Sequence, residues 1–320
     1  MHPITAKLKS RLKLPLIGSP LFIISNPDLV IAQCRAGVVG SFPSLNARPL
    51  PQLEEWLQRL STELTEADAP YAANLIVHKS TDRLMADLEL VVKYKVPVVI
   101  TSLGAREDVN AAVHSYGGIV LHDVINNRFA KKAIEKGADG IIAVAAGAGG
   151  HAGTLSPFAL VSEIREWFDG PLVLSGAIGT GAAILAAEAA GADFGYMGSA
   201  FIATEEARAD AHYKQAIVDG TASDIVYSDL FTGVSGNYLR PSIVAAGLDP
   251  DNLPKGDYKT MNFGSGGNTD AKAWRDIWGS GQGIGAVKEV LPAAELVARL
   301  KREYAAARAR LLEQSAPFAA

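Results

Sequence analysis

The chain has 320 residues, of which 48% are hydrophobic and 20% are charged, and its formal net charge is −4. This balance is typical of a globular protein with a large core and argues against a disordered chain. The slightly acidic charge gives no support for nucleic-acid binding, which usually requires a basic face.

The chain shows no signal that directs it to a membrane or to secretion. No apolar run reaches the roughly 18 residues of a membrane span, and the start lacks the apolar stretch of a signal peptide. We read the basic positions between Lys7 and Lys13 as a solvated start of the chain. Cys34 is the single cysteine, so no internal disulfide or cysteine-based metal site is possible, and we expect a buried thiol. The sequence predicts a cytoplasmic protein without a metal.

Short apolar runs alternate with longer helical patterns along the chain. The strands are expected at 14–17, 37–40, 72–77, 96–101, 119–122, 140–144, 172–175 and 194–197. The helices are expected near 28–36, 53–64, 82–94, 108–116, 128–136, 157–167 and 181–190, and a last one at 292–312. The strands are continuously apolar, which is typical of parallel strands covered on both faces.

Eight strand–helix units predict an α/β fold of the TIM (β/α)8 barrel type. The rival architecture is a doubly wound sheet. Its Gly-x-Gly-x-x-Gly fingerprint is absent, because the first strand runs into Gly18-Ser19-Pro20-Leu21-Phe22. We therefore favour the barrel.

A long segment separates the eighth strand from the final helix. It is rich in Gly, Asn, Asp and Pro, and a structureless loop of this length inside a compact domain would be unusual. We predict a barrel formed by residues 1–215 and 290–320, with a small inserted domain at 216–289. Its position after the eighth strand places it at the C-terminal mouth of the barrel, where active sites lie.

Two units carry a similar ending before their next strand. Ala133–Asp139 precedes the sixth strand and Ala187–Asp193 precedes the eighth, and each contains a glycine suited to ending a helix. The similarity fits either common loop chemistry or an ancestral repeat of the barrel.

Small residues follow the seventh and eighth strands. The turns are Ser175-Gly176-Ala177 and Gly198-Ser199-Ala200, each leading into a helix. Small residues allow backbone N–H groups to approach an anion, and the loops at these barrel positions commonly bind phosphate. We predict that Gly176, Ala177, Gly198 and Ser199 donate to a phosphate, with tight packing turns as the alternative.

A glycine-rich loop containing a histidine follows the sixth strand, in the segment Gly147–Gly153. The glycines make the loop flexible, and His151 can exchange a proton near neutral pH. Because the loop lies at the catalytic end of a barrel strand, we predict that His151 is catalytic, with a structural histidine as the alternative. No second ligand accompanies it, so zinc binding is not expected.

Other strand ends offer polar groups. Asn74 lies among apolar residues of the third strand, and a buried amide needs partners, either on neighbouring strands or on the edge of a flavin ring. Thr101 and Ser102 end the fourth strand, and His122 and Asp123 end the fifth. His122 either lines a cofactor or ties a loop.

Taken together, these motifs resemble the nitronate monooxygenases, once called 2-nitropropane dioxygenases. The resemblance rests on the His151 loop, the Ser175 turn, Gly191-Ala192-Asp193, the segment Met197–Phe201 and the late Trp278–Gly283 segment, and it covers nearly the whole chain. The combination is specific, although each motif alone is not.

The resemblance implies an FMN cofactor and a set of site residues. His151 would abstract a substrate proton or bind the anionic nitronate, and the turn at Gln282 would reach the pocket from the inserted domain. The cofactor would contact Ser19, Pro20, Leu21, Phe22, Asn74, His122, Gly149, Gly150, Ser175, Gly176, Ala177, Gly198, Ser199 and Gln282.

Three departures from the family's pattern are visible. Ala177 stands where many members have glycine, and it can still donate its N–H if its φ is negative. His122-Asp123 stands where several members have a lysine, which could stabilise an anionic reduced flavin. Gly18-Ser19-Pro20 replaces a glutamine and glycines.

The resemblance implies oxidation of alkyl nitronates by O2 to a carbonyl compound and nitrite. An NAD(P)H-dependent quinone or enoyl reductase using the same flavin is the first alternative, and a non-catalytic flavin-binding protein is the second. The expected partners are a nitronate or a quinone, with NAD(P)H as a further candidate, and a homodimer is the candidate assembly.

Overall fold

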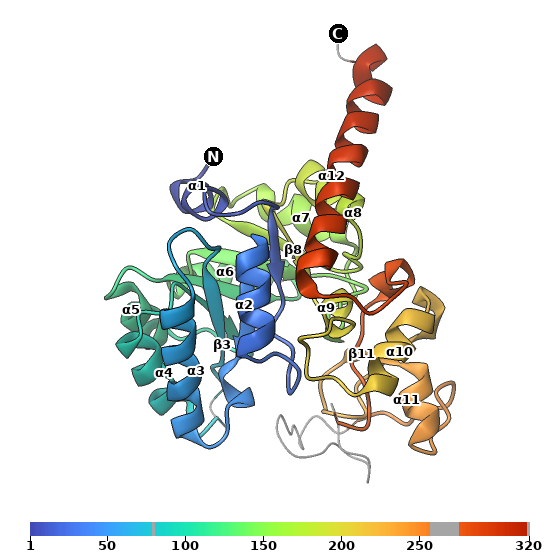
Figure 1. The fold of residues 1–320 in the computed structure, drawn as a ribbon, viewed down its shortest axis with the longest axis horizontal. Helices are drawn as coiled ribbons and strands as arrows, with labels where there is room; N and C mark the ends of the chain where they lie inside the picture. Colours follow the sequence, from blue (N-terminus) through green and yellow to red (C-terminus); the bar gives the residue numbers. More distant parts are fainter. Residues whose placement is uncertain (79–80, 257–274, 319–320) are drawn as a thin grey trace.

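The computed structural model describes residues 1–78, 81–256 and 275–318. Its centre is an eight-stranded parallel sheet that curls into a nearly closed barrel, with helices around it (Figure 1). The barrel strands are β1 (Leu16–Gly18), β2 (Gly40–Pro43), β3 (Tyr71–Ile76), β4 (Val98–Ser102), β5 (Ile119–Val124), β6 (Gly140–Val144), β8 (Leu172–Ser175) and β9 (Phe194–Met197). The predicted TIM-barrel fold is confirmed.

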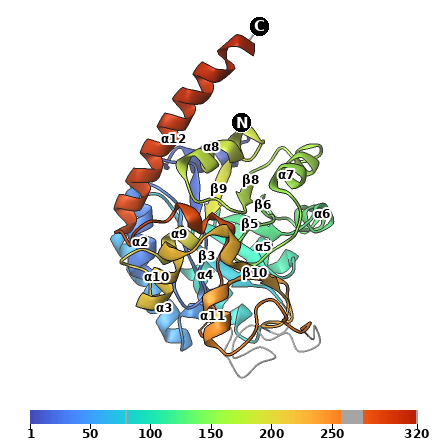
Figure 2. The same ribbon diagram turned by 90° about the vertical axis from the view of Figure 1, so that its right-hand side faces the viewer.

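Eight helices follow the barrel strands in sequence. They are α2 (Pro27–Ala36), α3 (Leu50–Glu63), α4 (Leu84–Lys93), α5 (Glu107–His114), α6 (Asn127–Glu135), α7 (Pro157–Arg165), α8 (Gly181–Ala189) and α12 (Ala293–Ser315). The long helix α12 packs against α8 and α2 and then runs past the barrel (Figure 2). No described helix combines the length and apolar character needed to cross a membrane.

The barrel closes between its first and second strands. Ile17 and Val39 form a parallel bridge, and the N–H of Gly18 donates to the carbonyl of Val39 over 2.8 Å. The second strand begins three residues later than predicted, because Gly37 takes φ +98° and ends α2 there instead of entering the strand.

The start of the chain differs from the expected solvated segment. Residues Pro3–Lys9 form the helix α1, and Leu8 is buried with residues of the barrel interior such as Ile17 and Val98. The side chain of Leu8 therefore closes the N-terminal end of the barrel, although the residues around it are basic. Lys7 points outward and is exposed.

Two clusters of the apolar core lie on opposite faces of the barrel sheet. One lies between the sheet and the helices and includes Val120 and Val124 of β5. The other fills the barrel interior and includes Ile119 and Leu121 of the same strand. Successive side chains of a strand point to opposite faces, so each strand supplies both clusters. Cys34 is fully buried in the outer cluster, as predicted, and burial raises the pKa of its thiol to about 12.

The two similar helix endings perform the same task. Gly137 and Gly191 both have positive φ, and the aspartate two residues later accepts a backbone N–H from the preceding strand. Asp139 Oδ2 lies 2.8 Å from the N of Val120, and Asp193 Oδ2 lies 2.9 Å from the N of Leu172. Because both loops make the same hydrogen bond between a backbone N–H and an aspartate, the similarity of their sequences has a structural explanation.

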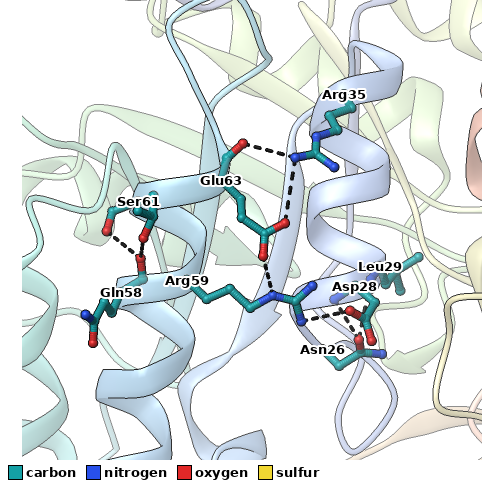
Figure 3. Close-up of polar contacts among 9 residues, drawn as sticks. Asn26, Asp28, Leu29, Arg35, Gln58, Arg59, Ser61 and Glu63 are labelled. Carbon is teal, nitrogen blue, oxygen red and sulfur yellow. Dashed lines mark hydrogen bonds and ion pairs between the residues drawn. The ribbon is translucent and has the colours of Figure 1, made fainter.

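Ion pairs link α2 and α3 on the outer surface. Arg59 of α3 reaches Asp28 of α2 over 2.8 Å and Glu63 of its own helix over 2.6 Å, while Asn26 caps the start of α2 (Figure 3). These charges are half exposed, so each pair contributes little, about 0–1 kcal/mol. The Asn26 side chain, which accepts the N–H groups of Asp28 and Leu29, sets the start of α2.

The segment after β9 forms further elements at the mouth of the barrel. They are α9 (Ser199–Ile202), α10 (Ala211–Asp219), β10 (Ile225–Ser228), β11 (Gly236–Leu239) and α11 (Arg240–Ala245). β10 and β11 form a three-stranded antiparallel sheet with β7 (Gly150–His151), which comes from the His151 loop. The boundary proposed at residue 216 falls inside α10, and residues 257–274 of the proposed insert lie outside the described residues, so the domain division stays a prediction.

Candidate active site

A large cavity opens at the C-terminal ends of the barrel strands. Its volume is about 720 Å³, and the loops after most of the strands line it. All the predicted cofactor residues except Gln282 contribute to its wall, as does His151. The structure therefore brings together residues that lie as far apart in the sequence as Ser19 and Ser199.

The loop of the first strand is held in place over this cavity by one side chain. Asn46 Nδ2 donates to the carbonyls of Leu21 and Ser25 over 2.9 and 2.8 Å, and its Oδ1 accepts from the N of Ile23 over 2.8 Å. Ser19, Pro20, Leu21 and Phe22 line the cavity from this loop. The sequence predicted the loop but not the asparagine that fixes it.

The turns after β8 and β9 supply backbone donors to the cavity. Among the described residues, the N–H groups of Gly176, Gly198 and Ser199 have no backbone acceptor. A Cβ on Gly198 would lie 2.5 Å from Ser19 Oγ, and one on Gly176 would lie 2.7 Å from the carbonyl oxygen of Ala146. The available N–H groups agree with the predicted phosphate site, and the close contacts with protein atoms agree with the alternative of tight packing turns, so the phosphate site stays a prediction.

Ala177 differs from the expected geometry. Its φ is +55°, not negative, and its N–H donates to the carbonyl of Gly147 over 3.2 Å. Its N–H is therefore already used within the protein. Three of the four predicted phosphate donors keep their N–H groups available.

His151 lies in a short strand and not in a flexible loop. β7 pairs with β11, so that His151 lies opposite Gly236 and Gly150 lies opposite Asn237. Asn237 Nδ2 also donates to the carbonyl of Ala148 over 2.7 Å. The segment after β9 thereby fixes the position of the histidine.

The His151 ring contacts a threonine of the same segment. Its Nε2 lies 2.9 Å from Thr232 Oγ1, and the Thr232 hydroxyl donates to the carbonyl of Val234 over 3.0 Å. This bond orients the ring, and the tautomer of His151 decides which of the two groups donates. Burial lowers the pKa of His151 to about 4, so the ring is neutral at pH 7 and can accept a proton.

The turn at Gly281 and Gln282 joins this arrangement from the far end of the chain. The N of Gln282 donates to the carbonyl of Gly147 over 2.9 Å, and the N of Gly281 donates to Ser199 Oγ over 2.9 Å. Gly281 lines the cavity, and the Gln282 side chain lies beside Gly147. Trp278 anchors the turn by stacking on Tyr213 at a centroid distance of 4.8 Å.

The floor of the cavity is a ring of side chains at the top of the barrel interior. Each follows, by two residues, a member of the interior cluster and therefore points inward. The ring consists of Asn74, Ser102, Asp123, Val144, Ser175 and Tyr196, and all of these line the cavity. Sequence reasoning named Asp123 as a polar group at a strand end without assigning it to the site, and it missed Tyr196. The two-residue alternation from Leu121 and Phe194 was the signal that could have found them.

His122 lies on the opposite face of β5. It follows Val120 by two residues and points with it toward the outer layer, where its Nδ1 lies 2.6 Å from Thr101 Oγ1. Burial lowers the pKa of His122 to about 4. It borders the cavity, and its partner Thr101 belongs to the neighbouring strand β4 and not to a loop, so its predicted contact with a cofactor stays a prediction.

A chain of hydrogen bonds crosses three strands of the floor. Asn74 Nδ2 donates to Ser102 Oγ over 2.7 Å, and Ser102 Oγ donates to Asp123 Oδ2 over 2.6 Å. Burial raises the pKa of Asp123 to about 6, opposed by the hydrogen bond from Ser102. Tyr196 has a pKa well above its usual value because of burial and the nearby Asp123.

The barrel fold is shared with proteins of known structure. The structure is similar to that of a nitroalkane oxidase from Streptomyces ansochromogenes, with a TM-score of 0.80 and 24% identity over 95% of this chain and 99% of that one. It is also similar to FabK from Thermotoga maritima, with a TM-score of 0.78 and 21% identity over 98% of this chain and 99% of the other. Likenesses at this level of identity show a shared fold.

The sequence gives the family. Residues 31–303 match the family model described as nitronate monooxygenase. The chain is 28% identical to a nitronate monooxygenase of Paraburkholderia phytofirmans over 90% of this chain and 92% of the relative. The chain belongs to the nitronate monooxygenase family, which confirms the resemblance found in its sequence.

Proposed function

We propose that this enzyme uses FMN to oxidise alkyl nitronates with O2, giving a carbonyl compound and nitrite. The observation that carries the proposal is the meeting of three groups in one cavity: the His151 strand, the donor turns after β8 and β9, and the Gly281 turn. Membership of the family supports it.

The residues of the cavity fit a flavin mononucleotide. The N–H groups of Gly176, Gly198 and Ser199 would hold the phosphate, and the loop at Ser19–Phe22 would cover the ring system. The volume of about 720 Å³ leaves room for a small substrate beside the cofactor. Bound flavin supplies the capacity to take electrons from the substrate and to react with oxygen.

The chain itself positions the substrate and exchanges protons with it. His151 is neutral at pH 7, so it can accept a proton from the carbon next to the nitro group of a neutral nitroalkane, which yields the nitronate. Once protonated, the same ring would hold the anionic nitro oxygens. Its hydrogen bond to Thr232 fixes its orientation.

The test is turnover by purified, flavin-loaded protein. We expect oxygen consumption and nitrite release with ethyl nitronate and propionate 3-nitronate, assayed at pH 6 and pH 8. Protein that carries flavin but gives neither signal with either substrate would contradict the proposal.

A reductase that takes hydride from NADH or NADPH is the second candidate. It is favoured by Asp123, a carboxylate on the cavity floor, because an anionic substrate gains nothing from it. Rapid bleaching of the bound flavin by either nucleotide under anaerobic conditions would support this candidate, and no bleaching with either would remove it. NAD(P)H use, a homodimer and a cytoplasmic location stay predictions.

A further inference from the structure

The carboxylate of Asp123 ends a hydrogen-bond chain that runs in one direction. The Asn74 amide can only donate through Nδ2, and Ser102 accepts that bond and passes its single proton to Asp123. Ser102 is the hydrogen-bond partner that the described residues give this carboxylate. The chain therefore leaves Asp123 as a terminal acceptor at the cavity floor.

The register of the sheet turns this side chain toward the ligand space. Asp123 shares the inner face of β5 with Ile119 and Leu121, which lie in the barrel interior. It keeps intermediate exposure, and it lines the cavity. A ligand at the cavity floor therefore meets this carboxylate.

The groups around Asp123 do not neutralise it by a close ion pair. No salt bridge within the described residues involves Asp123. Lys132 of α6 lies at the cavity wall but is exposed. The other titratable side chains that line the cavity are His78, His122, His151, Tyr196, Tyr213 and Tyr227.

We propose that Asp123 determines which ligands the cavity accepts. As a carboxylate it disfavours anions and favours uncharged ligands, and after protonation it admits a monoanion and donates a hydrogen bond to it. For nitronates, this selection rests on the proposed function. It predicts that nitronates bind more tightly in mildly acidic solution than at neutral pH.

The direction of the pH dependence follows from the state of Asp123. Its pKa of about 6 means that the protonated form is present below pH 6 and is lost as the pH rises. An anion that binds only that form should bind about tenfold more weakly for each pH unit above 6. A neutral ligand of the same shape should show no such trend.

The experiment measures equilibrium binding to the flavin-loaded protein by calorimetry. The probes are 1-propanesulfonate, which stays anionic between pH 5 and 8, and its uncharged isostere 1-propanesulfonamide. We expect the Kd of the sulfonate to rise with pH while the Kd of the sulfonamide stays level. Wild-type protein whose sulfonate Kd is independent of pH would overturn the proposal.

Two variants assign the effect to Asp123. Asp123→Asn should bind the sulfonate with a Kd that no longer depends on pH, provided that its flavin content matches the wild type. Ser102→Ala removes the bond that lowers the pKa of Asp123, so the midpoint of the pH dependence should move to higher pH. A merely structural loss in Ser102→Ala would weaken both probes equally without moving the midpoint, and this would count against the proposal.

The outcomes separate the roles of neighbouring groups and of the reaction itself. If Asp123→Asn keeps the wild-type pH dependence, another group such as His151 controls the anion, and the assignment is wrong. Because sulfonate binding requires no turnover, a failed nitronate assay with the expected binding data removes the proposed reaction and leaves the role of Asp123 standing. If nitronate is turned over but the Kd of the sulfonate does not depend on pH, only the role of Asp123 is removed.

Discussion

His151 is held by residues that lie far from it in the sequence. The strand pairing with Gly236 and the bond to Thr232 fix both the backbone and the ring. The role of general base proposed for His151 requires such support, because proton transfer depends on a short and well-aligned approach. The structure thus provides the precision that a glycine-rich loop alone would lack.

Replacement of His151 tests its role directly. His151→Ala should lower kcat/KM for a neutral nitroalkane such as nitroethane about 100-fold or more, since a positioned group that abstracts the proton contributes roughly 10²–10⁴-fold. Its flavin content should stay near that of the wild type. Steady-state oxygen consumption at pH 7 measures the effect.

The control is a histidine far from the chemistry. The His212 side chain is 90% exposed, and His212→Ala should retain wild-type turnover. Equal turnover in His151→Ala and His212→Ala would take His151 out of the reaction.

His122 should influence the stability of the protein at acidic pH. Its pKa is about 4 in the folded protein and 6.5 in the unfolded chain, so unfolding takes up a proton between these values. Its neutral form therefore supports stability above pH 6.5, and this support is lost as the pH falls toward 4. His151 acts in the same direction and Asp123 in the opposite one.

A non-titrating replacement isolates this contribution. His122→Asn should show a smaller loss of unfolding free energy between pH 7 and pH 4.5 than the wild type. Urea denaturation at several pH values measures the difference. Parallel pH profiles for the two proteins would contradict the assigned direction.

At the scale of elements, the barrel depends on close contact between its last helices. Gly181 begins α8, and a Cβ there would lie 2.2 Å from the carbonyl oxygen of Leu300 and 2.2 Å from the N of Tyr304 in α12. Glu303 of α12 also accepts the Gly181 N–H over 2.8 Å. The contact joins α12 to the side of the barrel where α8 begins.

Adding one methyl group should separate these helices. We expect Gly181→Ala to destabilise the protein by about 2 kcal/mol, because backbone atoms cannot move aside as a side chain can. The matched control is Gly285→Ala, whose Cβ would meet no atom within 4 Å. Equal urea midpoints for the two variants would show that α12 shifts without cost.

At the scale of the whole molecule, a cofactor that contacts both the barrel and the segment after β9 should stabilise the folded protein. A ligand that binds only the folded state stabilises it by about 2.7 kcal/mol at a free concentration 100 times its Kd. FMN should therefore raise the unfolding temperature of flavin-free protein. Differential scanning fluorimetry measures this shift.

Related flavins test the phosphate site. Riboflavin lacks the phosphate that Gly176, Gly198 and Ser199 would bind, so its shift should be smaller than that of FMN. FAD should also give a smaller shift, because its adenosine adds bulk beyond the phosphate turns. A larger shift with FAD than with FMN would identify FAD as the cofactor.

The sequence by itself determined the barrel and much of its rim. Apolar runs report burial on both faces, and Gly-rich turns at fixed strand ends report close approach, so both can be read without coordinates. His151, Asn74, Ser175 and Gly198 were placed in this way, and all of them line the cavity. The second strand was misplaced because Gly37, a residue that suits a strand start, serves as a helix end.

Only the tertiary structure decided which residues meet. The strand β7 forms because β11 pairs with it. A local pattern of two residues cannot predict a partner 85 positions away in the sequence. The direction of the His122 and Asp123 side chains depends on strand register, since a shift of one residue exchanges the two faces. The sequence therefore supplied the groups at the mouth of the barrel, and the register of the sheet determined that Asp123 faces the cavity while His122 faces the outer layer.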